Sequence, residues 1–251
     1  MFTSKDDLKL GYGVDMEIGK FLIDRKVPAG NLYWNNRLLY IVPMPGYLFI
    51  PQYMDIQYRL GLSKAELLSE QHLQLMEAIL HSAARLESKE IDFEAHIAEC
   101  VALAEPVCKN PSLLQDLIYY FSGEKEKSGV ALGTPYGSLN RADAYLFSLC
   151  CFEFDSALKK KLVDAWYALI VFYLIIDDLQ DIQSDFEQQE ENAVLEAGLN
   201  EEGAKSLEVL IHQSYQVMNT VNPVMANRID HKMQLMNVKQ VIDDFLKKNR
   251  K

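Results

Sequence analysis

The chain has 251 residues, of which 49% are hydrophobic, and it carries a formal net charge of −11 at neutral pH. This length and composition are sufficient for one large globular domain with a substantial core. The acidic balance, without a stripe of Lys and Arg, argues against nucleic acid as the main partner, because phosphate binding requires clustered basic side chains.

Membrane and secretory classes are also disfavoured by the sequence. The longest strongly apolar run, Ala165 to Ile176, is too short to span a bilayer as a helix. The first residues lack a basic region followed by an apolar run, so we expect no secretory signal. The four cysteines show no Cys-x-x-Cys spacing, which favours reduced thiols and a cytoplasmic location.

Residues 1–62 are the least regular part of the chain, because glycines and prolines interrupt every long helical pattern there. Within them, Arg37 to Tyr53 is rich in aromatic and β-branched residues and predicts a short hairpin or an extended segment. From Ser63 the pattern is helical, beginning with a capping box, Ser63-x-x-Glu66, and continuing to about Glu87. We therefore predict an irregular N-terminal segment, residues 1–62, packed on a helical domain, residues 63–251.

Further helices are predicted along the rest of the chain. Residues 91–107 and 112–121 have helical periodicity, and residues 122–138, rich in Gly and Pro, predict a flexible or ligand-covering loop. Residues 140–152 follow as a helix, and three side chains then precede helices as N-caps: Asp155, Asn200 and Asn222. The predicted fold class is all-α, a single-domain helical bundle.

The acidity of the chain is concentrated in one region. Residues 162–204 contain eleven Asp and Glu but no Lys, Arg or His, while the whole chain has 36 acidic and 25 basic residues. Subtracting these eleven acids leaves 25 against 25, so the net charge arises from this region alone. At its centre stands the sequence Asp177-Asp178-Leu179-Gln180-Asp181, directly after an apolar stretch.

The spacing of these aspartates places them around one side of a helix. Successive helical residues are about 100° apart, so Asp177, Asp181 and Asp185 fall within roughly 80° of one another, and Asp178 lies about 100° from Asp177. Mg²⁺ takes one or two carboxylates, keeps waters and completes its shell with phosphate oxygens, so the pattern favours a metal-held diphosphate. The same acids also fit a solvated helix end, and the spacing leaves both interpretations open.

Residues 172–185 resemble the second aspartate-rich motif of trans-polyprenyl diphosphate synthases, an apolar stretch followed by Asp-Asp-x-x-Asp and a further acid. The resemblance covers about residues 140–248 and implies the class I isoprenoid (terpenoid) synthase fold. It implies a Mg²⁺-dependent site for a prenyl diphosphate, with prenyl transfer or cyclisation as the activity. Its implied metal ligands are Asp177, Asp178 and Asp181, with Asp185 as a further ligand or a support.

The resemblance also suggests contacts for the substrate. Lys127 stands in a Lys-Ser-Gly sequence similar to the Lys-Thr-Gly of that family, and Arg141 is an alternative contact for the diphosphate. Trp166 and Tyr173 could line the prenyl pocket, although aromatic residues at helical spacing also fit an ordinary core.

The first aspartate-rich motif of that family is not found, since Asp55 is the only acidic residue in residues 41–60. This departure supports an alternative, a non-catalytic family member that binds a prenyl ligand or acts as a partner subunit in a homodimer or heterodimer. Whether the chain is an enzyme therefore stays open. A facing carboxylate cluster would decide it, and Asp55, Glu77 and Asp116 are the candidates.

A third interpretation is a di-metal carboxylate bundle. Glu77 precedes His81, and Glu208 precedes His212, each by four residues. Di-iron bundles instead use Glu-x-x-His at three-residue spacing, which makes ordinary surface pairs the simpler explanation.

Overall fold

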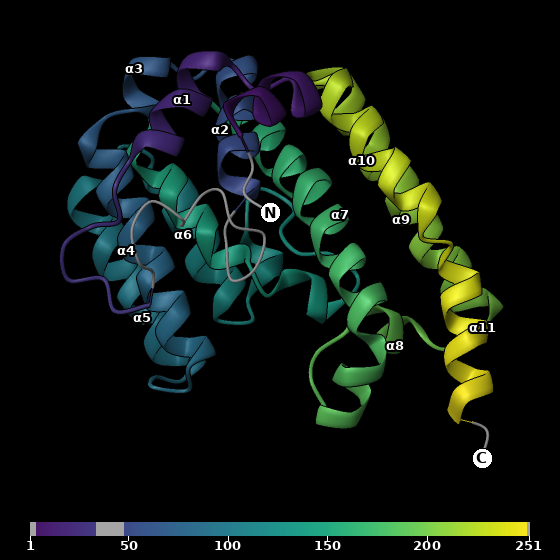
Figure 1. The fold of residues 1–251 in the computed structure, drawn as a ribbon. Helices are drawn as coiled ribbons and strands as arrows, with labels where there is room; N and C mark the ends of the chain where they lie inside the picture. Colours follow the sequence, from purple (N-terminus) through teal and green to yellow (C-terminus); the bar gives the residue numbers. More distant parts are fainter. Residues whose placement is uncertain (1–3, 34–47, 250–251) are drawn as a thin grey trace. The chain divides into compact units, whose positions relative to one another are not determined.

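The computed structural model describes residues 4–33 and 48–249, and every element within these ranges is a helix (Figure 1). The predicted all-α class is confirmed for this part of the chain. The chain divides into two compact units. Unit 1 comprises residues 1–10, 14–132 and 143–163, and unit 2 comprises residues 11–13, 133–142 and 164–251. The boundary predicted at residue 62 falls within unit 1 and stays a prediction.

The N-terminal part of unit 1 is more helical than its glycines and prolines predicted. Helix α1, Met16–Asp24, begins at Asp15, whose side chain accepts the backbone N–H groups of Glu17 and Ile18. Helix α2, Phe49–Leu60, contains Pro51 in its first turn, where the missing N–H group costs nothing. The hairpin predicted for residues 37–53 is therefore wrong at Phe49–Tyr53, and residues 37–47 lie outside the described ranges.

The long helix predicted from residue 63 is divided in two. Helix α3, Lys64–Leu67, ends after one turn, and helix α4, Glu70–Glu87, begins at a new cap, Ser69. The Ser69 hydroxyl accepts the N–H of His72, and the His72 ring bonds the Leu67 carbonyl at 2.7 Å. These local bonds stabilise the break between α3 and α4. The Ser63 side chain, which was predicted as the cap, makes no capping bond.

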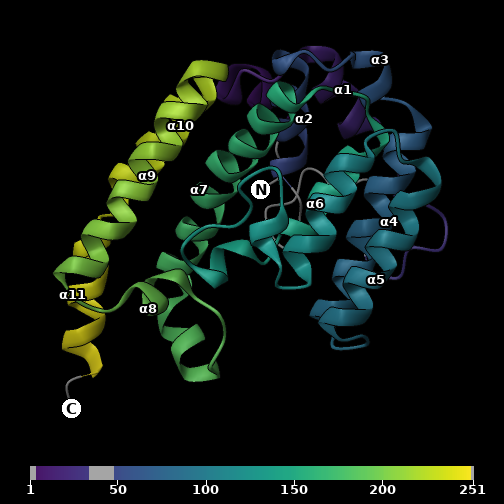
Figure 2. The ribbon, with the colours of Figure 1, turned by 180° about the vertical axis from the view of Figure 1, so that it is seen from behind.

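Helices α5, Phe93–Ala104, and α6, Pro111–Phe121, follow close to their predicted positions in unit 1, where α5 packs against α4 and α6 packs against α5 (Figures 1 and 2). Residues 140–152, predicted as an α-helix, instead form short 3₁₀ helices, η5 at Gly137–Asn140 and η6 at Asp143–Cys151. Every residue of η6 is buried, and η6 packs against α4 and α5. It therefore forms part of the core of unit 1.

Helix α7, Ser156–Gln188, carries the aspartates and starts at the predicted cap, because Asp155 accepts the N–H of Leu158 at 2.8 Å. Unit 2 continues with α8, Ala193–Ala197, α9, Glu201–Val221, α10, Pro223–Leu235, and α11, Val238–Asn249. Asn200 and Asn222 cap α9 and α10 as predicted. Figure 2 shows α9 and α10 running side by side, with α11 continuing along α9.

None of the helices within the described ranges combines the length and the apolar character that crossing a membrane requires. The apolar part of α7 is instead protein core, because residues 168–172 are all buried.

Candidate functional site

The aspartates lie on the second half of α7, within unit 2, and they differ in exposure. Asp178 is buried at 1% exposure between the buried side chains of Ile175 and Leu179. Asp177 is more open, with 43% of its side chain exposed. Asp181 is intermediate in burial and lies one turn further along the helix. One carboxylate therefore faces the interior of unit 2, while its neighbours border solvent.

Arg141 is the basic partner of these carboxylates, and its predicted contact with a diphosphate stays a prediction. Its Nη2 atom donates to Asp178 at 2.8 Å and lies 3.3 Å from Asp177. The other guanidinium nitrogen, Nη1, donates to the carbonyl of Ser138 at 2.8 Å. The guanidinium is thus held in place from two sides, and 28% of the side chain stays exposed.

The chain that follows α7 folds back onto the aspartates. The backbone N–H of Ala193 donates to the second oxygen of Asp178 at 2.7 Å. Asn192 donates from one amide to the Asp178 carbonyl at 2.8 Å and to Asp185 at 2.7 Å. Asp178 and Asp185 therefore fix the start of α8, a role that the sequence did not predict.

Glu196 on α8 ties a second segment to this region. Its carboxylate accepts the N–H groups of Gly137 and Ser138 at 2.7 and 3.0 Å and the Ser138 hydroxyl at 2.6 Å. Burial alone would raise the pKa of Glu196, but these hydrogen bonds lower it below its usual value. Because Ser138 also binds Arg141, Glu196 helps to position the guanidinium.

Burial and neighbouring charges shift the pKa values of Asp177 and Asp178. Burial raises the pKa of Asp177, and the carboxylates of Asp181 and Asp185 raise it further, while Arg141 opposes the shift. Burial also raises the pKa of Asp178 against the lowering effect of Arg141. A raised pKa means that the fold disfavours the ionised carboxylate, which a nearby positive charge would offset.

These contacts limit which carboxylates could hold a metal ion. Among the described residues, no group of three or more His, Cys, Asp and Glu side chains is arranged to hold an ion. Mg²⁺ needs fewer protein ligands, because one or two carboxylates suffice when phosphate oxygens and water complete its shell. Asp177 and Asp181, which are partly open and one turn apart, fit that smaller requirement. Both oxygens of Asp178 already accept hydrogen bonds.

The remaining predicted contacts are placed differently. Trp166 is fully buried, and Tyr173 is partly buried on the same helix. Lys127 belongs to unit 1, where its ammonium pairs with Glu124 at 2.6 Å on the surface. A contact that the sequence did not suggest is the Tyr167 hydroxyl, which accepts the N–H of Gly133 at 2.7 Å.

Each candidate for a facing carboxylate cluster is paired with a basic side chain. Asp55 pairs with Arg59 at 2.6 Å and also accepts the N–H of Asp15. Glu77 pairs with Arg25 at 2.6 Å, and Asp116 pairs with Lys159 at 2.5 Å. All three carboxylates are buried, at 0%, 4% and 6% exposure respectively, so each serves the interior of unit 1.

The residues of the di-metal alternative are likewise engaged in other contacts. Both oxygens of Glu77 bond to Arg25. The Nε2 atom of His212 lies 3.3 Å from the amide nitrogen of Gln216, one turn further along α9. Within the described ranges these pairs form no metal-binding group.

No family model, curated protein or solved structure matches this chain. Any functional interpretation therefore rests on the residues themselves and on the local resemblance of the aspartate motif.

Proposed function

We propose that the chain binds a prenyl diphosphate together with Mg²⁺ in the cytoplasm, as a helical protein of the isoprenoid synthase type. The observation that carries this proposal is the shared guanidinium of Arg141, which contacts Asp177 and Asp178 while Asp181 and Asp185 extend the same acidic face. A positive charge and a row of carboxylates side by side are what a metal diphosphate requires, since it presents both signs of charge.

The aspartates take different roles in this proposal. Asp177 and Asp181 hold the metal ion, because they are the partly exposed pair one turn apart. Asp178 and Asp185 support the site, since their side chains bind the start of α8. Arg141 contacts the diphosphate, and Mg²⁺ would supply further neutralisation of its charge. The apolar stretch of α7 before Asp177, including Trp166 and Tyr173, is the candidate surface for the prenyl chain.

A second candidate is the same binding without catalysis. In a catalytic family member, preorganised charge stabilises the departing diphosphate while the allylic bond ionises, and a second metal half-site contributes to this. Asp55, Glu77 and Asp116 are each neutralised by a neighbouring base, which favours a binding protein or a partner subunit. In the subunit version, the missing half-site lies on another chain of a homodimer or heterodimer.

Calorimetric titration with a non-hydrolysable farnesyl diphosphate analogue, with and without Mg²⁺, tests the proposal. We expect binding that requires Mg²⁺ and that weakens at least tenfold in Asp177→Asn and Asp181→Asn. Asp243→Asn is the matched control, because Asp243 is an exposed acid on α11 that pairs only loosely with Lys239, at 3.4 Å. Binding that is equal in all three variants, or independent of Mg²⁺, would reject the aspartate site.

Product analysis separates the two candidates once binding is established. Incubation with an allylic diphosphate, isopentenyl diphosphate and Mg²⁺ should give a longer prenyl product or a cyclic product if the chain is catalytic. Binding without any product, from the chain alone, would support the non-catalytic candidate.

A further inference from the structure

Three of the four cysteines meet at one junction of unit 1, although they are distant in the sequence. Cys108 stands in the connection between α5 and α6, and Cys150 and Cys151 are the last residues of η6. The backbone N–H groups of Lys109 and Asn110 both donate to the carbonyl of Cys150, at 2.8 and 3.2 Å. The two cysteine-bearing segments are therefore in direct backbone contact.

These hydrogen bonds limit the distance between Cys108 and Cys150. In a trans peptide the N–H of Lys109 points roughly at right angles to the line from its nitrogen to the Cα of Cys108. Standard backbone dimensions then place the Cα atoms of Cys108 and Cys150 no more than about 7 Å apart. Disulfides usually join Cα atoms that are about 4.4–6.8 Å apart. The backbone therefore holds this pair at disulfide range.

The side chains also distinguish Cys150 from Cys151 as the partner of Cys108. Burial raises the pKa of the Cys150 thiol, and among its charged neighbours Cys108 raises it most. The Cys151 thiol instead donates to the carbonyl of Ser148 at 3.3 Å, within its own 3₁₀ helix. Cys150 is therefore the better placed of the two.

Exposure decides which thiol meets an oxidant. Cys108 is the one cysteine of the four that is not buried. Cys150 is 0% exposed and Cys151 is 3% exposed. A solute therefore reaches Cys108 first, whereas Cys150 reacts only with a group that the protein brings to it.

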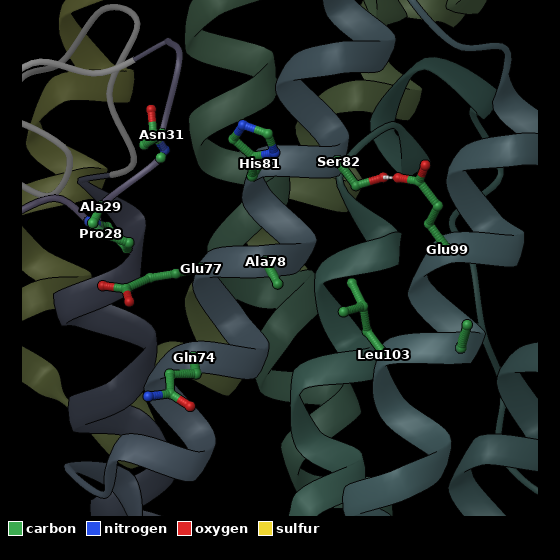
Figure 3. Close-up of a pocket in the computed structure, with 12 residues that line it drawn as sticks. Pro28, Ala29, Asn31, Gln74, Glu77, Ala78, His81, Ser82, Glu99 and Leu103 are labelled. Carbon is green, nitrogen blue, oxygen red and sulfur yellow. Dashed lines mark hydrogen bonds between the residues drawn. The ribbon is translucent and has the colours of Figure 1, made fainter.

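Cys100 on α5 serves as an internal control. In the sequence it lies between Glu99 and Leu103, which border a cavity of about 540 Å³ beside Glu77 (Figure 3). Cys100 does not line this cavity, and its side chain is fully buried. A small oxidant in the cavity would not meet the Cys100 sulfur directly.

We propose that Cys108 and Cys150 form a reversible disulfide when hydrogen peroxide reaches Cys108. The Cys108 sulfur, as a thiolate, attacks one peroxide oxygen and breaks the O–O bond, and the departing hydroxide takes up a proton and leaves as water. Cys108 is then a sulfenic acid. The Cys150 sulfur attacks the Cys108 sulfur, its thiol proton goes to the departing hydroxide, and a second water leaves. Two thiols are oxidised, and one peroxide is reduced to two waters.

The bond joins the start of α6 covalently to the end of η6. A disulfide that closes a long loop stabilises a protein mainly by restricting its unfolded chain. In a reducing compartment such a bond is transient, so the stability of unit 1 rises only while peroxide is present. This inference concerns unit 1 and does not depend on the proposed aspartate site.

The test treats the reduced chain with hydrogen peroxide, quenches with acid, and counts free thiols by alkylation under denaturing conditions and mass spectrometry. We expect two of the four thiols to be lost from a monomer and recovered with dithiothreitol. The melting temperature of the oxidised chain should be higher by at least about 5 °C.

Single variants identify the pair. Cys108→Ala, at a partly exposed position that tolerates the change, should keep all of its remaining thiols under peroxide. Cys100→Ala and Cys151→Ala should each still lose two thiols, whereas Cys150→Ala should form no disulfide.

Three results would overturn the proposal. They are retention of all four thiols in the parent chain, an equal loss of thiols in Cys108→Ala and the parent, and a disulfide that forms in Cys150→Ala but not in Cys151→Ala. An unchanged melting temperature in the oxidised chain would overturn the stabilising role of the bond.

Discussion

The two units treat their buried carboxylates in different ways. In unit 1 the buried Asp116 has a base of its own in Lys159, which also donates to Ser112 at 3.0 Å. In unit 2 the guanidinium of Arg141 is shared by Asp177 and Asp178, and two further aspartates follow on the same helix. The first arrangement is a closed ion pair, in which one acid is neutralised by one base. In the second, the acids outnumber the base.

The difference originates in the sequence. Residues 162–204 contain no Lys, Arg or His, so the base that neutralises Asp178 must come from elsewhere in the chain. It comes from residue 141, at the end of a short 3₁₀ helix. In the proposed function this acidic segment accepts a metal ion from solution, whereas the closed ion pair of unit 1 holds a core together.

The largest effect is expected from breaking the closed pair of unit 1. Lys159→Met leaves the buried Asp116 carboxylate with the N–H of Gly129 as a donor but without its ammonium partner. We expect a loss of about 3–5 kcal/mol in the free energy of unfolding, measured by urea denaturation, because an uncompensated buried charge is expensive.

Two controls define this result. The double variant Lys159→Met with Asp116→Leu should recover most of the lost stability, because an apolar pair replaces the ionic pair. Lys247→Met removes a pair with Asp244 that is exposed, and it should have only a small effect, because solvent screens an exposed pair. A loss from Lys159→Met as small as this would show that the pair of unit 1 is not a closed, buried one.

The next largest effect is a pH dependence that also belongs to unit 1. Burial lowers the pKa of His72 to about 4 in the folded chain, against 6.5 for a free side chain. Between these values the unfolded chain binds more protons, so stability is full above pH 6.5 and falls as the pH drops toward 4. The expected loss is about 3 kcal/mol, measured by urea denaturation across this range.

His72→Gln should flatten this slope, whereas His231→Gln, at an exposed position on α10, should leave it unchanged. If both variants kept the slope of the parent chain, His72 would not be the group that titrates.

A smaller effect is expected at the shared guanidinium of unit 2. Asp178→Asn replaces one acceptor oxygen by an amide, so either Arg141 or the N–H of Ala193 meets a donor instead. We expect destabilisation of about 1–3 kcal/mol, because one buried donor loses its partner. Thermal unfolding by circular dichroism would measure it, and a melting temperature equal to that of the parent would mean that Asp178 is not a structural acceptor.

The smallest effect is expected at Asp177, the partly exposed aspartate of unit 2. Asp177→Asn removes a half-exposed charge that lies near Asp181 and Asp185, so stability should change by no more than about 0.5 kcal/mol, in the favourable direction at low salt. High salt should remove this gain by screening. A clear loss of stability at low salt would show that Asp177 is needed by the fold, as Asp178 is.

The sequence predicted most of the helices because their signals are local. Asp155, Asn200 and Asn222 cap helices as expected, since a capping side chain bonds to N–H groups only two or three residues away. The break at Ser69 was missed because Ser63 and Ser69 both precede helical patterns, so one long helix that begins at Ser63 explained both. The 3₁₀ geometry of residues 143–151 has no local signal in the sequence. It is favoured by the burial of these residues in the core, which depends on distant parts of the chain.

The candidate site was predicted in part for a related reason. Arg141 was named as an alternative contact for the diphosphate, and in the structure it contacts two of the aspartates. Asn192, Ala193 and Glu196 were missed. Ala193 donates its backbone N–H to Asp178, and Glu196 accepts backbone N–H groups of residues 137 and 138. Such N–H groups are common to nearly all residues, so they give no signal in the sequence. The cavity beside Glu77 was likewise unpredictable, since it forms where small residues of separate helices meet.

The interleaving of the two units has a practical consequence for dissecting the protein. Residues 11–13 belong to unit 2, where Asn222 donates to the Tyr12 carbonyl at 3.0 Å and Arg228 lies over the Tyr12 ring. Residues 133–142, with Arg141, belong to it as well. A fragment cut before residue 164 would therefore keep all four aspartates but discard their guanidinium and the Tyr12 anchor, so truncation is a poor route to a minimal ligand-binding fragment.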